Sequence, residues 1–376
     1  MRFEKRSLCA MNMPYALGRL DLDGEECVVG ATEDHGQVML MRPPFREASE
    51  LVSGPGGCMA LLPDRQRPGS LFAVMGCFLG YKFQEGGIYR IRRTSQERAA
   101  RPDAGRTGTG SPAGGGDGRA DSGFSATKIL DLPFAHRIEL VDRPAGRFLI
   151  AAALAADKSD PTDWSKPGAL YAAPVPAEDA LDSRGGWKLV PILEGIHKNH
   201  GLLVARFQGR RTVLLSGSEG LFAIDLEAVG DLWPSRRVLE REISEIAVFD
   251  VDGDGKEELV TIEPFHGNAL RVYRDAAAGW ELAWEAELAY GHCLWTGEIA
   301  GRRSILVSNR SGSRDLVLFQ FPLSWGGASL DPERVVVDSG AGSANMLVLR
   351  SGEVERIFAT NQGSGEITMY TVVSGR

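Results

Sequence analysis

Residues 244–274 read SEIAVFDVDGDGKEELVTIEPFHGNALRVYR, and this stretch decides the fold. Apolar and polar residues alternate in EIAVFDV, EELVTIE and ALRVYR, which is the pattern of strands that bury one face. An Asp- and Gly-rich turn separates the first two segments, and the short loop PFHGN separates the second from the third. The stretch therefore predicts three consecutive antiparallel strands.

The same order of strand, turn, strand, loop and strand recurs in six further stretches, at residues 15–42, 57–90, 136–173, 200–225, 291–321 and 343–372. The linking segments WKLVPIL, SRRVLER and WELAWEAEL each fit a short fourth strand. Four short antiparallel strands repeated every ~40–45 residues are typical of a β-propeller. We therefore predict an all-β, seven-bladed propeller of four-stranded antiparallel blades over residues 1–376, with six or eight blades as alternatives. A strand near residues 2–10 would complete the last blade and close the ring.

Residues 94–125 do not fit a blade. They are rich in Gly, Arg, Ala, Ser and Asp and contain almost no apolar side chains. Such a segment cannot offset its ordering entropy by burying apolar surface. We predict a disordered insertion between the second and third blades.

The composition restricts the classes of molecule that the protein is expected to bind. The 376 residues are 43% hydrophobic and 24% charged, with a formal net charge of −8. Phosphate binding needs clustered Lys and Arg, so this balance argues against nucleic acid and gives no support to an anionic membrane. Five scattered cysteines without a CxxC pair argue against a disulfide framework or a zinc knuckle. With no apolar leader or membrane-length run, we expect a cytoplasmic protein.

Residues 250–258 form a D-x-D-x-D-G-x-x-E run. Oxygen side chains at alternating positions of a tight turn can all face one hard cation, Ca²⁺ or Mg²⁺. The run resembles the calcium loops of FG-GAP/VCBS propeller repeats. That resemblance implies a ligand set of Asp250, Asp252, Asp254, the backbone carbonyl of Lys256, and Glu258. A solvated acidic turn is the alternative, and an EF-hand is disfavoured because strands flank the run.

Five of the six histidines fall at two equivalent points of the repeat. His136, His200 and His292 stand at the start of predicted inner strands, and His35 and His266 lie in loops between second and third strands. Both loop families open on the same face of a propeller, so these side chains are expected to line one funnel. The three inner-strand histidines form a facial nitrogen set suited to Zn²⁺ or Mn²⁺. For any one histidine, the alternative is an ordinary loop residue bonded to a carbonyl.

Further polar residues are predicted to face the same funnel. Aromatic rings beside Lys, Arg and Asn are typical of sites for sugars or sugar acids. The predicted contacts to such a ligand are Lys82, Gln84, Lys158, Trp164, Asn309, Arg310, Asn345 and Asn361.

The motifs PGGCM, HKNHG, DVDGDGKEEL and EPFHGN together resemble the VCBS/FG-GAP-type propellers related to aldos-2-ulose dehydratase. The resemblance covers essentially the whole chain and implies a metal-dependent lyase or isomerase that acts on an oxidised sugar. In that chemistry the metal stabilises an enolate while nearby groups move protons. The implied acid and base candidates are His266, His35, Tyr81 and Lys198. The alternative is a non-catalytic propeller that binds a carbohydrate or a protein and carries only a structural calcium; a glycosidase-like hydrolase ranks last.

Overall fold

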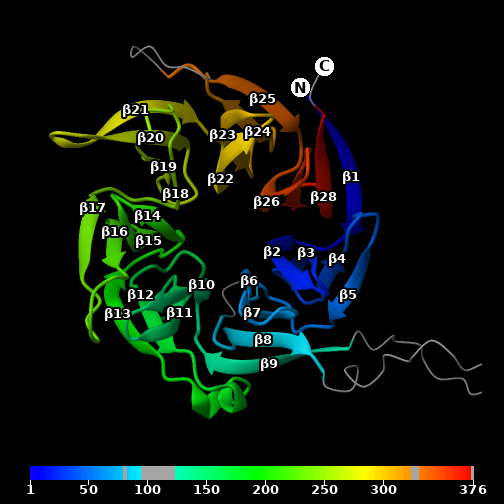
Figure 1. Cartoon of the computed structure of the whole chain (residues 1–376), viewed down its shortest axis with the longest axis vertical. Helices are drawn as coiled ribbons and strands as arrows, with labels where there is room; N and C mark the ends of the chain where they lie inside the picture. The colour runs from blue at the N-terminus through cyan, green and yellow to red at the C-terminus, as the bar shows by residue number, and fades with distance from the viewer. Residues whose placement is uncertain (79–82, 95–122, 323–329, 374–376) are drawn as a thin grey trace, which may run out of the picture.

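The computed structural model describes residues 1–78, 83–94, 123–322 and 330–373. These residues form seven four-stranded antiparallel sheets arranged as a ring around a central axis (Figure 1). The prediction of a seven-bladed β-propeller is confirmed. The described residues contain only two short 3-10 helices, and none of their helices is long and apolar enough to cross a membrane.

The first four blades each use four consecutive strands, listed here from the axis outward. Blade one contains β2 (Pro14–Leu22), β3 (Glu25–Thr32), β4 (Val38–Met41) and β5 (Ala48–Val52). Blade two contains β6 (Ala60–Pro63), β7 (Ser70–Met75), β8 (Gly87–Arg93) and β9 (Phe124–Asp131). Blade three contains β10 (Ala135–Arg143), β11 (Gly146–Ala153), β12 (Gly168–Pro174) and β13 (Val190–Ile196). Blade four contains β14 (Leu202–Phe207), β15 (Arg210–Gly217), β16 (Gly220–Asp225) and β17 (Ser235–Leu239).

The remaining blades follow the same plan, and the last one closes the ring. Blade five contains β18 (Glu245–Phe249), β19 (Glu258–Glu263), β20 (Ala269–Ala276) and β21 (Gly279–Glu287). Blade six contains β22 (Gly291–Ile299), β23 (Arg302–Asn309), β24 (Leu316–Gln320) and β25 (Glu333–Asp338). Blade seven contains β26 (Ser343–Ser351), β27 (Val354–Asn361), β28 (Glu366–Val373) and, as its outer strand, β1 (Arg2–Ala10). The pairing of β1 with β28 confirms the predicted closure, which leaves no open end in the ring.

The position predicted for the insertion is wrong. β8 ends at Arg93, β9 begins at Phe124, and the two strands pair within blade two. The insertion therefore lies between the third and fourth strands of one blade and not between two blades. Residues 95–122, on which the prediction of disorder rests, lie outside the described residues.

The core lies between the blades, because each sheet packs its faces against its two neighbours. Second strands carry the largest share of it: every residue of β7 is buried, and six of the eight residues of β3 are buried. A strand covered on both faces needs apolar side chains at successive positions, and the runs LFAVM and CVVGA supply them. The inner strands are more polar since one face looks onto the axis, which is where the candidate site forms.

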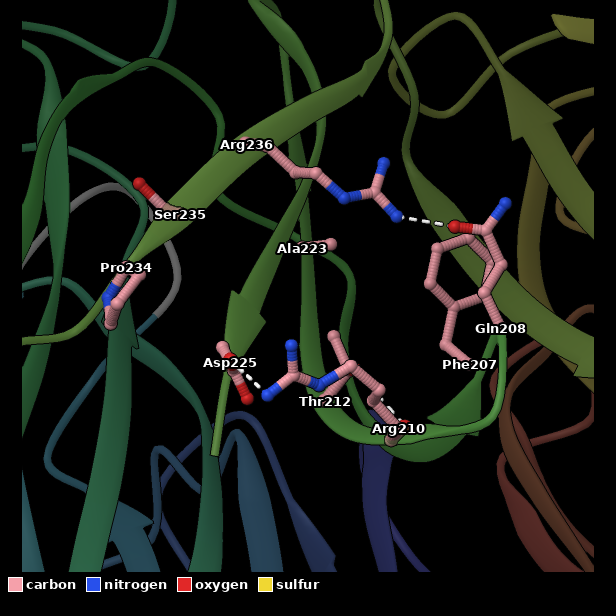
Figure 2. Close-up of a pocket in the computed structure, with 9 residues that line it drawn as sticks. All are labelled: Phe207, Gln208, Arg210, Thr212, Ala223, Asp225, Pro234, Ser235 and Arg236. Atoms are coloured by element: carbon pink, nitrogen blue, oxygen red, sulfur yellow. Dashed lines mark hydrogen bonds and ion pairs between the residues drawn. The ribbon is translucent and has the colours of Figure 1, made fainter. Parts of the chain in front are cut away.

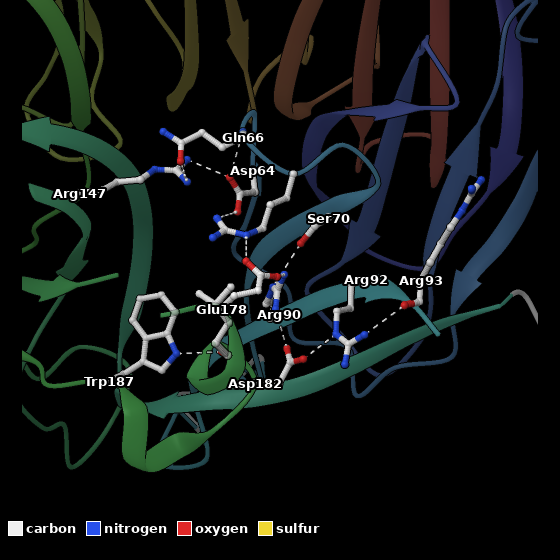
Figure 3. A network of polar contacts seen from close by, with 12 residues as sticks. Asp64, Gln66, Ser70, Arg90, Arg92, Arg93, Arg147, Glu178, Asp182 and Trp187 are labelled. Atoms are coloured by element: carbon white, nitrogen blue, oxygen red, sulfur yellow. Dashed lines mark hydrogen bonds and ion pairs between the residues drawn. The ribbon is translucent and has the colours of Figure 1, made fainter. Parts of the chain in front are cut away.

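The link between β12 and β13 packs on blade two. It contains the 3-10 helices η2 (Glu178–Ala180) and η3 (Arg184–Gly186), and the buried Trp187 ring meets Phe72 edge-on at 5.7 Å. Around this contact lies a network of ion pairs, drawn in Figure 3, that joins Arg90 and Arg92 to Asp182, Arg67 to Glu178, and Arg147 to Asp64. The link thus fastens blade three to blade two.

Candidate functional site

Four inner strands share an irregularity that turns one side chain toward the axis. In blades one, three and six the register of the first two strands shifts across Tyr15, His136 and His292, respectively. Blade seven has the same shift, across Ala344 and Asn345. A β-bulge of this kind re-aims the side chain at the bulge. The repeated bulge therefore gathers groups from different blades at one point.

Four histidines and one tyrosine meet there. The Nε2 atoms of His200 and His266 are 3.3 Å apart, and the ligand atoms of His200, His266 and His292 all lie within 4.8 Å of one another. The Tyr15 hydroxyl lies 2.9 Å from Nε2 of His136 and 3.5 Å from Nε2 of His292. We call these five residues the axial cluster. His136, His200 and His292 are at most 3% exposed.

Outer contacts fix the orientation of the rings. Nδ1 of His292 lies 2.8 Å from the carbonyl oxygen of Ala344, which can only accept, so Nδ1 carries the proton and Nε2 keeps its lone pair. Nδ1 of His266 lies 2.8 Å from the hydroxyl of Tyr290. In each case Nδ1 faces outward and Nε2 faces the cluster. This arrangement of outer partners is usual for histidines that bind metals.

A buried ion pair supports His200. One oxygen of Glu245 lies 2.8 Å from Nδ1 of His200 and 2.8 Å from Nη2 of Arg137. The contact with His200 is close, although it does not meet hydrogen-bond geometry. Burial alone would raise the pKa of Glu245, but Arg137 and His200 outweigh it and lower the pKa, so the carboxylate stays ionised.

The electrostatics keep the imidazoles neutral. Burial lowers the pKa of His136, His266 and His292 well below its usual value, and neighbouring histidines and arginines lower it further. The pKa of His200 is also lowered, first by burial, while Glu245 opposes the shift. Burial raises the pKa of Tyr15, so its hydroxyl keeps its proton. Neutral imidazole is the form that binds a metal.

The cluster fits a transition metal, with one change to the predicted ligand set. Two nitrogens bound tetrahedrally to Zn²⁺ at ~2.0–2.1 Å are about 3.3–3.4 Å apart, which matches the Nε2 separation of His200 and His266. The repeat pattern predicts His136, His200 and His292 as the ligands, whereas the structure groups His266 with His200 and His292 and pairs His136 with Tyr15. Metal binding itself stays a prediction.

Unusual backbone conformations hold the rim of the cluster. Lys198, His266 and Tyr290 have φ values of 54°, 48° and 60°, in the left-handed region that non-glycine residues seldom adopt. Such conformations cost energy and concentrate at binding and catalytic sites. They support a functional role for the loops that carry these three residues.

Several predicted ligand contacts form a wall beside His266. The Phe265 ring stacks on His266 at 4.0 Å and meets Trp164 edge-on at 5.4 Å. Nζ of Lys158 lies 3.3 Å from the centre of the Trp164 ring, and Nζ of Lys198 lies 5.5 Å from that of Phe265. Lys198 also pairs with Glu242 at 2.7 Å. The structure therefore brings together Lys158 and Trp164, predicted as ligand contacts, and Lys198, predicted as an acid or base; these roles stay predictions.

Other predicted residues have different surroundings. His35 stacks on Phe78 at 4.1 Å, and none of its described contacts reaches the axial cluster. Arg310 bonds Gln362 and lies 4.0 Å from the buried Glu33. Gln84 is exposed in a turn, and Tyr81 and Lys82 lie outside the described residues.

The three predicted asparagines are engaged within the protein. Oδ1 of Asn309 accepts the backbone N–H of Ala289, and Nδ2 of Asn345 donates to the carbonyl of Tyr15. The side chain of Asn361 is fully buried and bonds the hydroxyls of Ser343 and Tyr370. These amides fasten loops around the axis, and their predicted contact with a ligand finds no support.

The acidic run forms the turn between β18 and β19, at the end of blade five opposite the axial cluster. One oxygen from each of Asp250, Asp252 and Asp254 lies within 4.8 Å of the others. Asp252 also pairs with Arg274 at 2.8 Å, and a cation would compete with that contact. Burial raises the pKa of Glu258 to about 7, and its Oε1 is buried without a hydrogen-bond partner in the part of the chain that the structure describes. The three aspartates and Glu258 fit the predicted calcium shell, whereas the Lys256 carbonyl has no described contact there. Calcium binding itself stays a prediction.

Three residues of the site, Tyr15, Arg137 and Glu245, were not predicted from the sequence. Tyr15 occupies in blade one the position that His136 and His292 occupy in theirs, so aligning the units would have found it. Arg137 and Glu245 lie on the inner strands of blades three and five, and only the closed ring shows that they meet. No local motif signals such a contact.

Comparison with known proteins shows the fold. No protein-family model and no curated protein matches the chain. The β-propeller domain of Cps50 (Swd1) from Myceliophthora thermophila is 12% identical with a TM-score of 0.52, covering 98% of this chain and 100% of that domain. Sqt1 from Chaetomium thermophilum was solved bound to the N-terminus of ribosomal protein L10. It is 12% identical with a TM-score of 0.51, and the match covers 96% of this chain and 83% of the Sqt1 chain. The likeness is one of fold. The comparisons show no link to FG-GAP/VCBS propellers or to a dehydratase.

Proposed function

We propose that this chain is a binding propeller that holds a divalent transition metal, Zn²⁺ or Mn²⁺, between His200, His266 and His292. The observation that carries the proposal is the 3.3 Å approach of Nε2 of His200 to Nε2 of His266. Glu245 lies 2.8 Å from Nδ1 of His200 and the Tyr290 hydroxyl lies 2.8 Å from Nδ1 of His266; with the proton on each Nδ1, two lone pairs would face each other at the Nε2 atoms. A bound cation would turn that repulsion into two ligand bonds.

The surroundings support a metal over a shared proton. Burial and neighbouring positive charges oppose protonation of these rings, as their lowered pKa values indicate. A metal bound by three neutral imidazoles keeps its positive charge and an available coordination position. The metal would polarise a ligand bound there, and the wall formed by Trp164 and Phe265 would contact it.

A binding role is favoured over the lyase hypothesis. Sqt1, which shares the fold, is described as bound to a segment of another protein, and this supports a non-catalytic propeller. Lyase chemistry is the second candidate because the hydroxyl of Tyr15 lies 2.9 Å from His136, a donor and acceptor pair beside the metal position. A carbohydrate as the ligand stays a hypothesis.

The test is metal analysis of purified variants after loading with Zn²⁺ and dialysis. We expect about one zinc per chain in the wild type and in His136→Ala, and loss of zinc in His266→Ala. His197→Ala is the matched control, since His197 pairs with Glu219 at 2.6 Å outside the cluster. Absence of zinc from the wild type, or equal zinc in His266→Ala and the control, would refute the proposal.

The two candidate functions separate in a second assay. The zinc-loaded protein is incubated in D₂O with a keto-sugar and, separately, with a sugar acid. Non-catalytic binding predicts no deuterium next to the carbonyl and no unsaturated product. Exchange that is lost in Tyr15→Phe with zinc retained would instead establish the lyase hypothesis.

A further inference from the structure

Blade four carries a second candidate site on the face opposite the axial cluster. A cavity of about 260 Å³ opens there between the β14–β15 turn and the outer strand β17. Figure 2 shows its lining residues: Phe207, Gln208, Arg210, Thr212, Ala223, Asp225, Pro234, Ser235 and Arg236. We call this cavity the blade-four pocket.

The pocket combines an apolar floor with cationic walls. Phe207 and Ala223 form part of the floor and are 3% and 6% exposed, and the Trp280 ring of blade five stacks on Phe207 at 5.6 Å. Arg210 is neutralised, because its guanidinium lies 2.8 Å from Asp225. A ligand in the pocket would therefore meet a small apolar floor, beside which Arg210 contributes little net charge.

Arg236 differs from Arg210 because its partner is neutral. Its guanidinium donates to the amide oxygen of Gln208 at 2.5 Å and lies 5.8 Å from the centre of the Phe207 ring. Among the described residues, no carboxylate forms an ion pair with it. A neutral amide thus holds a guanidinium over an apolar cavity, which leaves its charge available to an incoming carboxylate.

The strand beside the pocket has a free edge. β17 is the outer strand of blade four and pairs only with β16 among the described strands. An extended peptide can add to such an edge through main-chain hydrogen bonds. Arg237 on this strand is paired with Glu240, whereas Arg236 has no carboxylate partner among the described residues, so the charge available beside this edge is positive and favours an acidic strand.

The loop before β17 offers apolar contacts. Val229 and Leu232 are 82% and 75% exposed, more than any other large hydrophobic residue described. Both lie in the link from β16 to β17, a few residues from Pro234 in the pocket wall. Their side chains are available for apolar contacts with a segment bound along β17.

We propose that the blade-four pocket binds an acidic, extended segment of a partner protein, which pairs with β17 and places a carboxylate on Arg236. An apolar side chain next to that carboxylate would contact Phe207 or Leu232. The site is separate from the axial cluster and does not depend on a bound metal.

The test measures fluorescence anisotropy of a labelled ten-residue peptide that alternates Glu with Val. We expect binding by the wild type and at least a tenfold weaker Kd for Arg236→Glu. Arg2→Glu is the matched control, since it makes the same charge change at a side chain that is 74% exposed on blade seven. Leu232→Ser, which leaves the charge unchanged, should also weaken binding severalfold.

Several outcomes would overturn the proposal. A wild-type Kd weaker than about 1 mM, equal weakening in Arg236→Glu and Arg2→Glu, or equal binding of a peptide that alternates Lys with Val would each do so. Full displacement of the peptide by 5 mM inorganic phosphate would indicate a simple anion site. A doubled mass by light scattering, together with no peptide binding by the dimer, would assign the pocket to a second copy of the chain.

Discussion

Replacing Glu245 by Gln is expected to destabilise the protein through a charge that loses its partner. Glu245 and Arg137 come from blades five and three, and their side chains are only 13% and 16% exposed. Their contact of 2.8 Å joins blades three and five directly beside His200. Gln keeps the shape of Glu245 but leaves the Arg137 guanidinium without a counter-charge among the described residues.

The expected size follows from the burial of the pair. Removing one partner of a buried ion pair typically costs about 3–5 kcal/mol, because the other charge stays in a poorly solvated place. The double variant Arg137→Met/Glu245→Gln removes both charges and should recover most of the lost free energy of unfolding. Arg302 and Glu333 form a contact of 2.7 Å at 31% and 60% exposure, and breaking it should cost about 0.2–1 kcal/mol.

The assay is urea unfolding followed by tryptophan fluorescence and far-UV circular dichroism. Both single variants, the double variant and the Arg302→Met/Glu333→Gln set are compared in a double-mutant cycle. A coupling free energy of at least about 2 kcal/mol is expected for the axial pair, well above that of the surface pair. Additivity of Arg137→Met and Glu245→Gln within about 0.5 kcal/mol would refute the account of the site as a coupled buried pair.

Three further predictions concern other parts of the molecule. Burial raises the pKa of Glu139 from 4.5 to about 7, so the free energy of unfolding should fall as pH rises between these values; Glu139→Gln should match the wild type at pH 4 and exceed it by up to about 3 kcal/mol at pH 8 in urea titrations. Gly220→Ala should lower the melting temperature more than Gly209→Ala, because both glycines have positive φ but only a Cβ at Gly220 would meet the Leu239 carbonyl, at 2.1 Å; equal shifts would contradict this packing. Ca²⁺ at 100 times its Kd should stabilise the wild type by about 2.7 kcal/mol and leave Asp250→Asn unchanged in thermal unfolding, whereas a stabilised variant would show that the ion binds elsewhere.

Much of the fold could be predicted because each blade repeats the same local pattern. The alternation in residues 244–274 identifies three strands without any long-range information, and the recurrence of the pattern gives the number of blades. The fourth strand of blade two, β9, was not predicted because it follows the long insertion in the sequence and no turn motif precedes it. Local patterns therefore identify hairpins more reliably than strands that pair across a long connection.

For the candidate site, the sequence predicts only that the histidines lie on one face of the propeller. The positions of His200 and His292 in the repeat place them on the axis, and the structure agrees. The choice between His136 and His266 as their neighbour depends on loop conformation, including the left-handed backbone at His266. The bulge that aims Tyr15 at His136 depends on register, which a single sequence does not reveal.

The pairing of β1 with β28 has a consequence for synthesis on the ribosome. Residue 10 and residue 366 are paired in blade seven and are separated by 356 positions. At ~5–20 residues per second, roughly 20–70 s pass before β28 is made, and until then β1 has no strand to join. During this interval six blades can form while the seventh cannot, so the nascent chain is an open arc with an uncovered sheet face at each end and an unpaired β1. Chaperone demand and co-translational aggregation should therefore depend on how fast the final blade is translated.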